Sequence, residues 1–173
     1  SGDFTLVNGL ARNRIVRLNT DGTVDTSFDA GSGFSDSVQE IGVQPDGRVV
    51  AVGHFTSVNG VNRNRIARLN SDGSVDDTFN PGGGANNPIL DMLVQPDGRT
   101  VIVGDFSSFN GVSRKGVARI NSDGTLDETF GLGDGPDFSV HAVVMQRDGR
   151  VIIAGDFKNY DGVAYEGVVR LNS

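Results

Sequence analysis

A 51-residue unit that repeats along the chain constrains the fold more than any other feature of the sequence. The stretch GDFTLVNGLARNRIVRLNTDGTVDTSF begins at Gly2 and returns with few changes at Gly53 and Gly104, before a shorter copy starts at Gly155. Because every unit has the same length, neighbouring copies bury apolar surface against one another rather than around one centre. We therefore predict one repeat array over 1–173, with units at 2–52, 53–103 and 104–154 and a partial unit at 155–173.

Short turn motifs divide each unit into strands. Asn8-Gly9, Asp21-Gly22, Asp46-Gly47 and their equivalents accept the positive φ of two-residue hairpin turns, and they lie between apolar runs of strand length. In the second unit's phase we predict strands over 38–45, 48–55, 65–70 and 74–79, with a looser SVNGVNRN connection. The Gly-rich segment at 80–88 is interpreted as a flexible crossing to the next blade. The blades then cover 38–79, 89–130 and 140–172, with an N-terminal hairpin at 12–28.

The strands are apolar on both faces. A two-residue turn at Asp46-Gly47 places Val43 opposite Val50 and Ile41 opposite Val52, and the segments MLV and TVIVG of the next blade have no polar face. An antiparallel sheet usually exposes one face to solvent. Two apolar faces therefore predict that each sheet packs between the copies before and after it. We predict an all-β fold of four-stranded antiparallel meanders, stacked as β-propeller-type blades every 51 residues. A β-solenoid is the alternative, and the hairpin turns argue against its parallel stacking.

The repeated motif is Gly-Asp-Phe, then Asn-Gly, then Arg-(Ile/Val)-(Ala/Val)-Arg-(Leu/Ile)-Asn-x-Asp-Gly, then Val-Gln-Pro-Asp-Gly-Arg. It closely resembles the delta-60 repeat family over the whole chain. The resemblance implies a β-propeller of unknown function, found mostly in secreted or cell-surface bacterial proteins, and it transfers no catalytic residue. The chain departs from the pattern at His54, at Arg147 in place of Pro, and at Gly116 and Gly167 in place of the first arginine of the third strand.

Charged and aromatic residues that recur in the copies are interpreted as structural. A residue kept in every copy is explained most simply by a structural role that all copies share. A buried charge also needs a partner of opposite charge or a hydrogen-bond acceptor. The guanidinium fork of each arginine would bridge backbone carbonyls or a carboxylate at a blade edge. A ligand site lined by the arginines is the alternative. The positions are Arg17, Arg68, Arg119, Arg170, Asp25, Asp76, Asp127, Phe28, Phe79 and Phe130.

Composition excludes several classes of partner. Fifteen basic against twenty-two acidic residues give a net charge of −7 without charged runs, which argues against nucleic acid. The absence of cysteine excludes disulfides and thiolate zinc sites. No apolar run approaches the length of about 18 residues that a membrane helix needs, so we predict no membrane insertion.

No cofactor, metal site or catalytic residue is predicted. The segment LNTDGTVD resembles a calcium loop, but arginine stands where an EF-hand needs its first acidic ligand, so a hairpin turn is favoured. Weak calcium binding by the acidic connector 134–137 stays open. His54 and His141 lack a partner histidine at metal-ligand spacing, and PGGGANNP lacks the Lys-Ser/Thr of a phosphate-binding loop. No Ser/His/Asp set recurs, although a triad assembled across blades stays open.

The favoured function is a non-enzymatic extracellular or cell-surface module that binds a ligand or acts as a scaffold. A glycan or a protein would contact aromatic residues that occur in single copies on loops, namely Phe34, Phe138, Tyr160 and Tyr165. One alternative is a structural component of a surface appendage or phage particle. The other is a propeller lyase or hydrolase with its site in the central funnel.

A further copy of the chain, or further repeats of a longer parent, is the predicted partner. Ser1 precedes a motif already under way, so we expect a processed product or an excised piece. The repeats amount to about three and a third blades, whereas a closed propeller has four or more. Two copies would close a six-bladed ring, with strands near Ile15 to Asn19 and Val168 to Asn172 at the seam.

Overall fold

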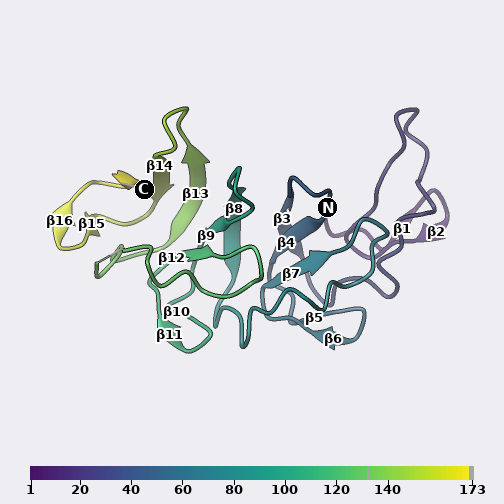
Figure 1. Cartoon of the computed structure of the whole chain (residues 1–173), viewed down its shortest axis with the longest axis horizontal. Coiled ribbons are helices and arrows are strands. Elements are labelled where there is room, and N and C mark those ends of the chain that lie inside the picture. Colours follow the sequence, from purple (N-terminus) through teal and green to yellow (C-terminus); the bar gives the residue numbers. More distant parts are fainter. Residues whose placement is uncertain (132, 172–173) are drawn as a thin grey trace.

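Three antiparallel sheets follow one another across the molecule and lie side by side in Figure 1. The computed structural model describes residues 1–131 and 133–171, and all its regular elements are β-strands. The predicted all-β propeller fold is confirmed, while Leu132, Asn172 and Ser173 lie outside the described residues. Blade 1 contains β3 (Val38–Val43), β4 (Val49–Gly53) and β7 (Ile66–Leu69); blade 2 contains β8 (Ile89–Val94), β9 (Thr100–Gly104) and β12 (Val117–Ile120); blade 3 contains β13 (Val140–Met145), β14 (Val151–Gly155) and β17 (Val168–Leu171).

Each Asn-Gly or Asp-Gly pair in the looser connection forms a tight hairpin of its own. Asn59 and Gly60 have φ values of 47° and 76°, as a two-residue turn with two left-handed residues requires, and Val58 pairs with Val61. The predicted Asn-Gly turn is confirmed, and the connection predicted to be looser than the others contains a short hairpin of its own. The hairpins are β1 (Leu6–Val7) with β2 (Leu10–Ala11), β5 (Ser57–Val58) with β6 (Val61–Asn62), β10 (Ser108–Phe109) with β11 (Val112–Ser113), and β15 (Asn159–Tyr160) with β16 (Val163–Ala164).

The turn between the first two strands of blade 1 is one residue longer than predicted. Gln44 N donates to Arg48 O at 2.8 Å, so the loop spans 45–47. Pro45 suits the first position of such a loop because its ring holds φ near about −65°, and Gly47 ends the loop with a left-handed φ of 83°. Both predicted cross-strand pairs are wrong by one residue: Val43 lies opposite Val49 rather than Val50, and Ile41 opposite Ala51 rather than Val52.

The fourth strand of each predicted meander is reduced to a single bridge. In blade 1, Leu69 pairs with Val75, after which Asp76 begins a turn that Phe79 N closes by donating to Asp76 O at 3.3 Å. That turn ends the strand predicted over 74–79. The hairpin predicted over 12–28 is likewise one bridge, and no described strand lies beside it to extend the pairing.

The hydrophobic core lies between neighbouring elements of the array, as the two apolar faces predicted. One cluster packs the N-terminal segment, through Ile15 and Phe28, on blade 1. A second joins blade 1 to blade 2, and a third joins blade 2 to blade 3. The first strands contact one another, β8 lying between β3 and β13. Gly42 permits a close approach, because a Cβ there would lie 2.6 Å from Val94.

One apolar face of blade 3 lies open within the described residues. The strand register brings Ala142, Ala154 and Val168 into one row, and Val144, Ile152 and Arg170 into the next. Val144 and Val168 are each 56% exposed. The equivalent face of blade 2 is buried against blade 3, so this surface, which we call the open face, has the composition of a contact between blades.

The Gly-rich connectors are held by the hairpins that follow them, which differs from the predicted flexible crossing. Asn110 at the tip of β10–β11 accepts from Gly83 N at 2.9 Å, and Asn110 N donates to Gly84 O at 2.7 Å. Gly82 has a left-handed φ of 60°, and a Cβ there would lie 2.3 Å from the Asn110 side chain. The backbone N–H of Gly83 therefore donates to a side chain of the protein, and it is not available to bind a phosphate.

Candidate functional site

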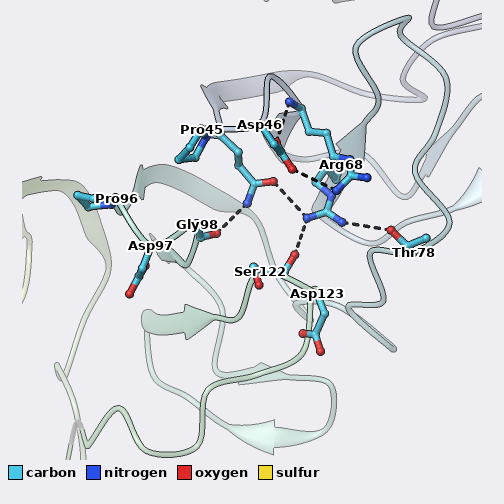
Figure 2. A pocket seen from close by; sticks show the side chains of 11 residues that line it. Pro45, Asp46, Arg68, Thr78, Pro96, Asp97, Gly98, Ser122 and Asp123 are labelled. Atoms are coloured by element: carbon cyan, nitrogen blue, oxygen red, sulfur yellow. Dashed lines mark hydrogen bonds and ion pairs between the residues drawn. The ribbon is translucent and has the colours of Figure 1, made fainter.

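Arg68 joins blade 1 to blade 2 through a nearly complete set of partners. Its side chain is 5% exposed, its Nε donates to Asp76 at 2.7 Å, and its Nη2 donates to Thr78 at 3.3 Å. The guanidinium carbon lies 4.9 Å from the ring centre of Phe79. Nη1 crosses to blade 2 and donates to the carbonyl oxygen of Ser122, as Figure 2 shows. The arginine thus bridges a carboxylate and a backbone carbonyl.

Gln44 extends the same network. Glutamine recurs at this position as Gln95 and Gln146, but the recurrence alone did not predict this role. The Oε1 of Gln44 accepts from Arg68 at 3.2 Å and its Nε2 donates to Gly98 O of blade 2 at 2.7 Å. The side chains therefore satisfy one another across the blade interface.

Arg17 and Arg119 repeat the cluster with different degrees of burial. Arg17 bonds Asp25 at 2.8 Å, lies 5.0 Å from the Phe28 ring centre and also donates to Ser71 O, but its side chain is 41% exposed. In blade 2, Arg119 bonds Asp127 at 2.8 Å and lies 4.4 Å from the ring centre of Phe130, with 9% of its side chain exposed. Arg170 is exposed on the open face.

The carboxylate of Asp127 is stabilised in its charged form. Burial alone would raise the pKa of this group, but hydrogen bonds from Thr129 Oγ1 at 2.6 Å and Arg119 Nε at 2.8 Å outweigh it and lower the pKa to about 2. The pKa of Asp76 is also lowered: burial would raise it, but hydrogen bonds from Thr78 and Arg68 outweigh that effect.

Acid is expected to weaken the fold through Asp127. Because its folded pKa of about 2 lies below the ordinary 3.8, its contribution is complete above pH 3.8 and is lost as the pH falls through 2. We expect the stability difference between the wild type and Asp127→Asn to shrink by about 2 kcal/mol over this window. Urea unfolding midpoints at several pH values measure the difference, with exposed Asp3→Asn as the control. A difference that does not change with pH contradicts the assignment.

A cavity of about 480 Å³ lies above this network, between the turns of blades 1 and 2. Figure 2 shows Asp46, Asp97, Gly98, Ser122 and Arg68 among the residues that line it. The carboxylate of Asp97 is paired with Arg99 at 2.6 Å. Charged side chains that line the cavity, such as Asp97 and Arg68, are thus paired with neighbouring residues. We therefore interpret the cavity as a groove between blades.

Two of the aromatic residues predicted to contact a ligand are buried instead. Phe34 is 2% exposed and packs edge-on against Phe55 at 4.7 Å, and Tyr160 is 8% exposed. Phe34 and Tyr160 lie in equivalent β-bridges, each of which joins a connector to the hairpin that follows it. Where the side chain on the connector is large, its partner on the hairpin is smaller, and the reverse. The bridged pairs are Phe34 with Val58, Ala85 with Phe109, and Pro136 with Tyr160. These single-copy residues therefore fill the core, and the prediction for Phe34 and Tyr160 is wrong.

The other two predicted contact residues are exposed, Phe138 by 69% and Tyr165 by 44%. Phe138 borders a second cavity, of about 370 Å³, between blades 2 and 3. Strand β9 begins beside the first cavity and ends at Gly104 in the second, so the two lie at opposite ends of the blade. Gly116, one of the departures from the repeat pattern, lines the second cavity.

The histidines do not form a metal centre in the described residues. His54 Nδ1 lies 3.2 Å from Ser37 Oγ, and His141 Nε2 lies 2.8 Å from Asp156. Across residues 1–131 and 133–171, no three His, Asp or Glu side chains gather closely enough to hold an ion. Weak calcium binding by the connector 134–137 stays a prediction. The described part of the chain also contains no helix long and apolar enough to span a bilayer.

Antiparallel blades, buried arginine clusters between them and connectors held by hairpins define a β-propeller repeat protein. The chain belongs to the family described as "Domain of unknown function (DUF5122) beta-propeller", whose model matches residues 1–28, 44–79, 95–130 and 146–173. No curated protein and no solved structure matches the chain. The matched segments include the arginine clusters. The connectors and first strands, at 29–43, 80–94 and 131–145, lie outside them.

Proposed function

We propose that the chain is a non-enzymatic module that binds a ligand or serves as a scaffold in a secreted or cell-surface protein, as the resemblance to delta-60 repeats implies. The repeated charges support this proposal, because Arg68, Asp76 and Arg119 are already engaged in contacts within and between blades. A catalytic site would need such groups to be free toward a substrate.

The observation that carries the proposal is the placement of Phe138. It is 69% exposed, it belongs to the connector between blades 2 and 3, and it stands at the rim of a cavity. An exposed aromatic ring beside a cavity is the kind of residue that dominates contact with a glycan or a protein. Because a ring with this exposure adds little to the core, its role lies at the surface.

Glycan and peptide arrays probed with the labelled chain test the proposal. We expect at least one probe to be retained, and Phe138→Ser to weaken that retention by about tenfold, as loss of a central aromatic contact does. Leu6→Ser, at a 63% exposed site on the β1–β2 hairpin, is the control and leaves retention unchanged. Conversion of an array glycan, equal retention by Phe138→Ser, or no retained probe would each overturn the binding role.

A further inference from the structure

The residue directly before the third strand is an arginine in the second unit and a glycine in the next two, and Arg14 holds the equivalent position in the first unit. Arg14, Arg65 and Gly116 share a left-handed backbone, with φ values of 68°, 67° and 63°. The position therefore has the same backbone geometry whether or not a side chain is present. What differs is the space that the side chain takes.

In the first two units the guanidinium group rests on backbone carbonyl oxygens. Arg14 Nη1 donates to Phe34 O at 2.8 Å. Arg65 Nη1 donates to Phe55 O at 3.2 Å and also to His54 O. Both side chains are half-buried at the junction with the next connector. The two arginines thus use different carbonyls: Arg14 uses that of a connector residue, and Arg65 uses those of the two residues that follow β4.

The third unit has the residues equivalent to those that supply these carbonyls, but a glycine in place of the arginine. The residues equivalent to Phe34, His54 and Phe55 line the cavity of about 370 Å³ at Gly116, and they are Pro136, Asp105 and Phe106. Sequence comparison of the units singled out Gly116 as a departure, but only the structure shows that the departure leaves a cavity.

We propose that this cavity binds a guanidinium group supplied by another molecule, namely the side chain of an arginine on a partner protein. The proposal rests on the binding function proposed above and names the chemistry of the ligand. A planar guanidinium offers five N–H donors and no acceptor, which matches the backbone carbonyl oxygens that Arg14 and Arg65 use in the first two units.

The rim of the cavity favours a planar cation. Phe138 offers an exposed ring on which a guanidinium can stack. Two carboxylates, Asp105 and Asp137, line the cavity against one cation, Lys115, so the local charge is negative. Lys115 stands where the second unit has Asn64, so Lys115→Asn is expected to raise affinity for a cation.

The test uses two small probes, N-acetyl-arginine methylamide and its uncharged isostere N-acetyl-citrulline methylamide, titrated into the isotope-labelled chain. We expect the arginine probe to shift the amide resonances of Gly116 and Ser107, and the citrulline probe to bind at least about tenfold more weakly, because it lacks the charge. Phe138→Ala should weaken binding of the arginine probe by about two- to fivefold, the size of an exposed cation–π contact.

Two reciprocal variants locate the site. Gly116→Arg restores the residue of the first two units and should abolish the shifts; a Cβ there lies 3.1 Å from Gly104 O, so its folding is checked by thermal unfolding. Arg65→Gly should open a second site between blades 1 and 2, with new shifts at Phe55 and Thr56. Equal binding of both probes, or shifts that persist in folded Gly116→Arg, would overturn the proposal. If the arrays retain a partner whose binding Gly116→Arg leaves unchanged, the binding function stands and the guanidinium site fails.

Discussion

Replacing Arg68 by Ala is expected to lower the free energy of unfolding by about 2–4 kcal/mol. This is slightly below the roughly 3–5 kcal/mol for removing one partner of a buried charge pair, because Arg48 stays 3.3 Å from Asp76. The variant would leave Asp76, whose side chain is 4% exposed, without its closest cation, and would remove the link to Ser122 of blade 2. Urea unfolding followed by circular dichroism measures the change.

Arg17→Ala is the matched control, because Arg17 has equivalent partners in Asp25 and Phe28 but is 41% exposed. Solvent screens an exposed pair, so we expect a loss below about 1 kcal/mol. If Arg68→Ala folds with unchanged stability and loses a ligand instead, the arginines line a binding site and the structural interpretation is wrong.

The 173-residue chain is expected to associate with another copy at low micromolar concentration. Val144 and Val168 on the open face are each 56% exposed, so each forgoes about half of the roughly 1.5–3 kcal/mol that full burial contributes. We propose that the open face meets the N-terminal segment of a second chain, near Ile15 and Leu18, as a two-fold dimer that closes a six-bladed ring. Of the predicted seam strand 168–172, Asn172 lies outside the described residues.

Size-exclusion chromatography with light scattering should therefore give twice the mass of one chain. Val144→Lys should yield the single chain, because the new charge would be buried at the contact. Val43→Lys is the control, since Val43 is 66% exposed on β3 and lies outside the open face. A wild-type monomer that unfolds cooperatively would contradict the dimer, and a ladder of sizes would favour an open array within a longer parent.

Local chemistry made most of the fold predictable. An Asn-Gly pair such as Asn59-Gly60 has few other conformations that suit it, and its hairpin was predicted correctly. The Asp-Gly turns were harder, because Asp46-Gly47 alone does not distinguish a loop of two residues from one of three. Pro45 carried that information, and overlooking it shifted every pair of the sheet by one residue.

The candidate site was less predictable because its contacts join separate units. Pairing of Arg68 with a carboxylate follows from its charge, but its carbonyl partner at Ser122 depends on how one blade twists against the next. The burial of Phe34 was not predicted for the same reason. The space that its ring fills is formed beside Val58, which belongs to the hairpin of the next unit.

Those bridges, Phe34 with Val58, Ala85 with Phe109 and Pro136 with Tyr160, also limit how such a gene can rearrange. Tandem arrays lengthen and shorten by crossing over between copies, and a crossover between connector and hairpin would part the two members of a bridge. Phe34 would then meet Phe109, two large rings in the space of one, or Ala85 would meet Val58 and leave a void. The segment that can be exchanged without repacking is therefore one that carries a connector together with the hairpin after it.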